Sequence, residues 1–76
     1  MTTTTVFLKE INDVKDFVNV LMRFGFDIDL VSGKYVVDAK SIMGIFSLDL
    51  SKPIELRAYT EDAEELFAAL DKYIVK

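Results

Sequence analysis

The side chains able to carry chemistry in this sequence are carboxylates, hydroxyls and amines, because the 76 residues contain neither histidine nor cysteine. Enzymes use those two missing side chains for much of their proton transfer and nucleophilic attack near neutral pH. The sequence also has no glycine-rich phosphate loop, nucleophile elbow or serine–histidine pairing. We therefore predict that the chain is not an enzyme and has no catalytic residue.

The densest group of carboxylates is formed by Glu61, Asp62, Glu64 and Glu65. Such a group suggests a divalent-metal site, but the run lacks the spacing and the glycine turn of an EF-hand, and metal ligands normally converge from different elements. Negative charge at the start of a helix is the better explanation, because it complements the helix dipole. We predict no metal site and no cofactor.

Composition narrows the choice of partners. Nine basic residues against thirteen acidic ones give a net charge of −4, and the lysines are spread along the chain. Binding to nucleic acid or to an anionic membrane needs clustered cations, so neither partner is expected. No apolar run approaches the roughly 18 residues of a membrane span, and residues 1–5 do not resemble a signal peptide. We expect one cytoplasmic domain covering residues 1–76.

The elements that would position these side chains follow from the spacing of apolar residues. Val14, Phe17, Val18 and Leu21 fall on one face of a helix, which we expect to begin at Asn12 or Asp13 and to end at Gly25. The remaining predicted elements are strands over residues 3–9, 26–30, 35–39 and 54–59, a short helix within residues 41–50, and a last helix capped by Thr60 with its apolar stripe running to Ile74.

The resulting order is β-α-β-β-α-β-α. A sheet that carries all its helices on one face is the simplest way to bury elements with a single apolar side. We therefore predict an α+β open-faced sandwich with a four-stranded antiparallel sheet and three helices on one face.

One stretch resembles a known family. Residues 37–48 have the sequence VDAKSIMGIFSL. This is similar to the signature of the HPr family, in which a strand ends in a Lys-Ser-Ile-Met-Gly-type run that opens the short second helix. Residues 26–30 and 54–70 also resemble HPr in pattern and spacing, so the resemblance covers roughly residues 14–75. It implies the open-faced sandwich and a relationship to the phosphoenolpyruvate-dependent sugar phosphotransferase system.

HPr proteins carry a phosphoryl group on a histidine at the start of the first helix, with an arginine and a proline close behind. Counting back from Ser41 without gaps, the resemblance places these positions approximately at Glu10, Asn12 and Asp13. Because the sequence has no histidine, we expect the histidine phosphocarrier activity to be absent. An acyl phosphate on Glu10 is also disfavoured, since neither arginine of the sequence lies nearby to stabilise the incoming charge.

Ser41 is the candidate regulatory residue. In Gram-positive members of the family, the serine of this motif is phosphorylated by a dedicated ATP-dependent kinase, and the modified protein then binds a transcriptional repressor. A phosphate on Ser41 would stand at a helix N-terminus beside Lys40, where negative charge is favoured. The competing interpretation is structural, because serine is among the commonest helix caps.

The resemblance also implies that exposed apolar residues of the short helix contact partner proteins. Met43 and Phe46, three residues apart, are the better candidates, and Ile42 and Lys40 complete the predicted interface. The alternative is a place in the core, which we expect for Ile45 and Leu48 and which also fits Ile42.

Two main hypotheses follow. The first is an HPr-like regulatory or interaction protein, possible partners being an HPr-kinase-type enzyme, a repressor or a phosphotransferase-system enzyme. The second is a scaffold module that uses the same fold without a switch. A third hypothesis is a protein that binds a small molecule or a metal ion. A fourth, a phosphocarrier that uses a residue other than histidine, is almost excluded.

Overall fold

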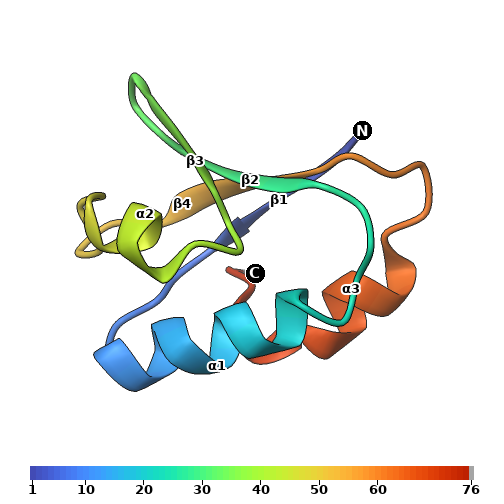
Figure 1. Ribbon diagram of the computed structural model, residues 1–76, viewed down its shortest axis with the longest axis horizontal. Helices are drawn as coiled ribbons and strands as arrows, with labels where there is room; N and C mark the ends of the chain where they lie inside the picture. Colours follow the sequence, from blue (N-terminus) through green and yellow to red (C-terminus); the bar gives the residue numbers. More distant parts are fainter. Residues whose placement is uncertain (76) are drawn as a thin grey trace.

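Four strands form one antiparallel sheet, and the helices pack against one of its faces (Figure 1). The computed structural model describes residues 1–75. The predicted α+β open-faced sandwich is confirmed. Its elements are β1 (Thr2–Val6), α1 (Ile11–Leu21), β2 (Ile28–Ser32), β3 (Tyr35–Asp38), α2 (Ile42–Phe46), β4 (Ile54–Ala58), α3 (Glu64–Ala69) and a 3-10 turn, η1 (Asp71–Tyr73).

The order of strands across the sheet is β1-β4-β2-β3, which leaves β1 and β3 at the edges. β2 and β3 form a hairpin whose last pair is Ser32 with Tyr35. Gly33 has a φ of 59°, and no other residue of the described chain has a positive φ. A positive φ at the first loop position alone is typical of a type II′ turn, which glycine adopts without strain.

The core lies between the sheet and the helices. Ile54, Leu56 and Ala58 alternate along β4 with half-buried residues, as expected for a strand with one buried face. From α1, the apolar stripe predicted by its spacing is buried against them: Val14, Phe17, Val18 and Leu21. No helix in the described part of the chain combines the length and the apolar character needed to cross a bilayer.

The start of α1 differs from the prediction. The cap is Glu10, two residues before Asn12. The Asp13 carboxylate accepts hydrogen bonds from the backbone N–H groups of Lys9 and Glu10, both at 3.2 Å. Asp13 therefore stabilises the first turn from inside the helix rather than preceding it. The helix also ends at Leu21, four residues before Gly25.

The last helix is shorter than predicted at both ends. Thr60 does not cap it, because the Thr60 hydroxyl accepts a hydrogen bond from the Asp62 N–H at 3.3 Å in a turn before the helix. Ile74 lies beyond α3, in an antiparallel bridge with Val6. The Val75 N–H donates to the Thr5 carbonyl at 2.8 Å. β-Branched residues are weak helix formers, and here they pair with part of an otherwise open sheet edge.

Candidate interaction site at the second helix

Ser41 is the N-cap of α2. Its backbone is extended, with φ −107° and ψ 111°, and its Oγ accepts a hydrogen bond from the Gly44 N–H at 3.1 Å. A Cβ on Gly44 would lie 3.3 Å from this Oγ and 3.4 Å from the Cβ of Val37. The absence of a side chain at position 44 therefore lets α2 approach β3 while Ser41 keeps its capping bond.

The apolar residues of α2 divide between core and solvent. Met43 is 80% exposed, Phe46 39% and Ile42 36%. The burial predicted for Ile45 and Leu48 is confirmed, but the core position that also fitted Ile42 is wrong. The helix is only five residues long, and of its side chains only that of Ile45 is buried. The exposed residues Ile42, Met43 and Phe46 are called the α2 patch below.

Lys40, also predicted at this surface, has a structural contact that the sequence did not indicate. Its Nζ donates to the carbonyl oxygens of Phe24 at 2.7 Å and Phe26 at 2.9 Å. These carbonyls belong to the connection between α1 and β2. The Lys40 ammonium therefore joins two connections of the chain, and its charge is engaged by these two carbonyl oxygens.

Glu10, the approximate position of the missing histidine, is exposed at the start of α1. α2 contacts α1 and lies over this end of it (Figure 1). The fold thus brings Glu10 and the α2 patch to one end of the molecule. Ile11, which was not among the predicted residues, is 63% exposed here. It lies in the first turn of α1, outside the buried stripe that begins at Val14.

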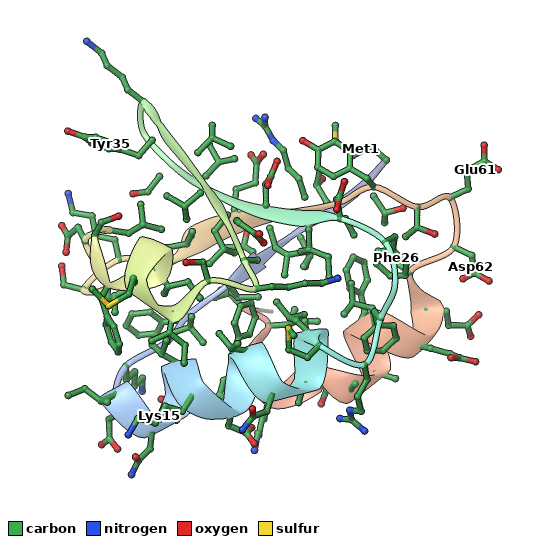
Figure 2. The ribbon with its side chains drawn as sticks, viewed as in Figure 1. Met1, Lys15, Phe26, Tyr35, Glu61 and Asp62 are labelled. Carbon is green, nitrogen blue, oxygen red and sulfur yellow. The ribbon has the colours of Figure 1, made fainter. Side chains whose placement is uncertain are left out.

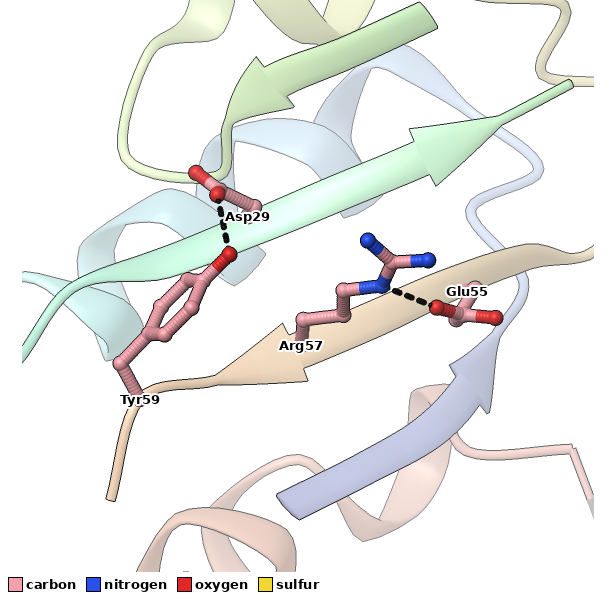
Figure 3. Close-up of polar contacts among 4 residues, drawn as sticks. All are labelled: Asp29, Glu55, Arg57 and Tyr59. Atoms are coloured by element: carbon pink, nitrogen blue, oxygen red, sulfur yellow. Dashed lines mark hydrogen bonds and ion pairs between the residues drawn. The ribbon is translucent and has the colours of Figure 1, made fainter. Parts of the chain in front are cut away.

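Both arginines lie away from Glu10. Arg23 follows the opposite end of α1, a helix of 11 residues and hence about 16 Å in length. Arg57 projects from the outer face of the sheet and pairs with Glu55, which raises the pKa of the guanidinium (Figure 3). On the same face, the Tyr59 hydroxyl donates to Asp29 at 2.9 Å, and this bond raises the pKa of the tyrosine.

The acidic group considered for metal binding lies elsewhere. Figure 2 shows Glu61 and Asp62 projecting from the loop before α3, at the end of the molecule opposite α2. The Asp62 carboxylate accepts a hydrogen bond from the Glu64 N–H at 3.1 Å. Among residues 1–75, no three carboxylates gather closely enough to hold a metal ion.

Comparison with known proteins decides the family. Residues 12–76 match the family model described as "PTS HPr component phosphorylation site". The chain belongs to the HPr family. Its fold resembles that of HPr-C-His from Thermoanaerobacter tengcongensis, with a TM-score of 0.79 and 32% identity over 95% of this chain and 89% of that one. It also resembles the phosphocarrier protein HPr from Bacillus anthracis str. Ames, with a TM-score of 0.73 and 30% identity over 97% of this chain and 96% of that one. No curated protein sequence matches it.

HPr membership relates the chain to the phosphotransferase system, and contacts with proteins of that system are a property of the family. Lys40, Ser41 and the α2 patch all fall within the matched residues. Glu10 lies just before them, so its assignment as the position of the missing histidine stays a prediction.

Proposed function

We propose that this HPr-family protein acts through regulated protein contacts at α2 and does not carry a phosphoryl group on histidine. The observation that carries the proposal is the position of Ser41. Its hydroxyl caps α2 at the edge of a patch whose most exposed member, Met43, projects into solvent. A charge added at Ser41 would therefore change the surface that a partner protein meets.

The local contacts favour a docking switch over an unfolding switch. A phosphate ester on Ser41 stays at the N-terminal end of α2, where free amide groups attract negative charge. Lys40, the adjacent cation, is engaged by the carbonyls of Phe24 and Phe26. The phosphate is consequently left available to basic residues of a partner while α2 keeps its place.

The chain's own residues argue against a carrier role. A phosphohistidine cannot form in a sequence without histidine. Neither guanidinium is placed to stabilise a phosphoryl group on the Glu10 carboxylate, because Arg23 stands at the other end of α1 and Arg57 is paired with Glu55. We accordingly propose a protein that is not an enzyme and that binds an HPr-kinase-type enzyme and then a repressor or a phosphotransferase-system enzyme.

The test is intact-mass analysis after incubation with ATP and an HPr kinase. We expect one phosphoryl group on the wild-type chain and none on Ser41→Asn. Asparagine is the matched control because it still caps a helix but offers no hydroxyl, so a loss of modification cannot be attributed to a frayed α2. Modification of Ser41→Asn would place the site elsewhere, and an unmodified wild-type chain would contradict the switch.

A non-switchable scaffold is the second candidate. The bond from the Gly44 N–H gives Ser41 a structural reason to be serine without any kinase. In that case the α2 patch would bind its partner equally well in the wild-type chain and in Ser41→Asn, and ATP with kinase would change nothing.

A further inference from the structure

The β3 edge of the sheet is open, apolar and self-complementary in charge. We propose that two copies of this chain associate through it, with the two β3 strands antiparallel and centred on Val36. This inference goes beyond the proposed function and does not depend on it. It would join two four-stranded sheets into one of eight strands.

The two edges of the sheet differ. At the β1 edge, the Val75 N–H donates to Thr5 and the Phe7 N–H donates to the Tyr73 carbonyl, both at 2.8 Å. At the β3 edge, Tyr35 is 69% exposed and Val36 57%. Exposed apolar edge strands are templates for pairing with another chain, so β3 is the edge that needs a partner.

The pairing pattern shows which backbone groups of β3 are available. The Ala39 N–H donates to the Ile28 carbonyl at 2.9 Å, and hydrogen-bonded residues alternate along an antiparallel strand. Val37 and Tyr35 therefore direct their backbone groups toward β2, while Val36 and Asp38 direct theirs outward. Of these outward groups, the Asp38 carbonyl already accepts the Ser41 N–H at 3.0 Å. The N–H and carbonyl of Val36 lie at the centre of the free edge.

An antiparallel pair centred on Val36 has favourable neighbours at every position. Val36 meets Val36 of the second copy, Tyr35 meets Val37, and Lys34 meets Asp38. Opposite charges across strands stabilise a pair, and so do contacts between aromatic and β-branched side chains. The run KYVVD is thus complementary to itself when reversed, and a second copy is the occupant that this edge fits.

The charges on the outer face of the sheet are an independent reason to expect this dimer. Asp29 and Asp38 are directly opposite each other in the β2–β3 register. Like charges in this position are destabilising, and neither carboxylate forms an ion pair with a residue of the described chain. Arg57 is the residue of β4 that pairs with Asp29, but its guanidinium already forms an ion pair with Glu55 (Figure 3). Lys34 of a second copy would bring the missing positive charge to Asp38.

The interface is small, since β3 has only four residues. We therefore expect a weak dimer and test for it by sedimentation velocity from roughly 10 µM to roughly 1 mM. The mean mass should rise with concentration toward twice that of one chain. A wild-type chain that stays monomeric at the highest concentration would overturn the proposal.

Two substitutions at the exposed Val36 test the geometry of the pair. Val36→Pro removes the outward N–H, and proline is tolerated at an edge where that group faces solvent, so the monomer should keep its circular dichroism spectrum while the dimer is lost. Val36→Thr keeps the N–H and a β-branched side chain, and it should still associate. Unchanged association of Val36→Pro would mean that another surface is used.

A charge exchange then tests the register. Lys34→Glu and Asp38→Lys each place like charges across the pair, so each alone should raise the dissociation constant at least about tenfold. Mixed in equal amounts, they restore both opposite-charge contacts and should associate as heterodimers. Failure of the mixture to associate while both variants are folded would reject the register. Asp38→Lys loses a side-chain bond to the Lys40 N–H. If Asp38→Lys fails to fold, the register is tested by comparing the dissociation constants of Lys34→Glu and Val36→Thr, of which only Lys34→Glu should weaken the dimer.

Discussion

The hydroxyl of Tyr73 donates a hydrogen bond to the carboxylate of Asp16 at 2.5 Å, across 57 residues of sequence. The Lys72 ammonium lies 3.0 Å from the same carboxylate. The Tyr73 ring is buried edge-on against Phe17, with the ring centroids 6.1 Å apart. The segment that follows α3 is therefore held to α1 by two polar contacts with Asp16 and one aromatic contact with Phe17.

The Asp16 contact predicts a loss of stability in acid. The hydrogen bond from Tyr73, followed by that from Lys72, lowers the pKa of Asp16 below its usual value of 3.8. The unfolded chain therefore binds this proton at a higher pH than the folded chain does. Stability from Asp16 is complete above that usual value and is lost as the pH falls through the lowered pKa.

We expect Asp16→Asn to flatten the acid limb of the melting temperature measured between pH 7 and pH 2. The pKa of Asp49 is also lowered, mainly by the Ser51 hydroxyl, so Asp49→Asn should remove a separate part of the same slope. An acid limb unchanged by Asp16→Asn would contradict the assignment.

Ser41 allows a prediction about stability that is independent of any kinase. Ser41→Ala leaves the Gly44 N–H without its partner and should lower the free energy of unfolding by about 1 kcal/mol. Ser41→Asn restores an acceptor and should lie within about 0.5 kcal/mol of the wild type. Urea denaturation of the three proteins checks this. Equal losses in both variants would show that the capping bond contributes nothing.

Lys40 should matter for the fold. Lys40→Met keeps most of the side chain but removes the ammonium from the carbonyls of Phe24 and Phe26, so we expect a loss of about 1–3 kcal/mol. Lys15→Met is the matched control, because Lys15 is exposed on the outer side of α1 (Figure 2) and should change stability by less than about 0.5 kcal/mol. Equal effects of the two substitutions in denaturant titrations would argue against the Lys40 contact.

A substitution in the α2 patch should weaken the binding of a partner protein without lowering the stability of the fold. Met43→Gln changes a side chain that is largely in solvent, so its melting temperature should match that of the wild type. If α2 is the docking surface, the KM of an HPr kinase for this variant should rise about threefold to tenfold. Met22→Gln alters a methionine of similar exposure beyond the far end of α1 and should leave KM unchanged. An equal rise for both methionines would remove the special role of α2.

Local patterns in the sequence were sufficient for much of this protein. The alternation along β4 and the spacing of Val14, Phe17, Val18 and Leu21 predicted which faces are buried, because period and hydrophobicity act over a few residues. Ser41 was identified as a cap for the same reason, since its bond spans three residues. The lack of histidine, which bears most directly on activity, is a property of the sequence alone.

Only the tertiary structure decided the contacts that join distant segments. The reach of Lys40 to Phe24 and Phe26, the bond from Tyr73 to Asp16, and the bridge between Ile74 and Val6 all link residues that no local pattern relates. The helix boundaries shifted where such contacts competed with local preference. Ile74 does not continue the predicted helix, because the open edge of β1 provides hydrogen-bond partners for the backbone of its segment. A backbone group is stabilised by whichever partner the whole fold brings to it.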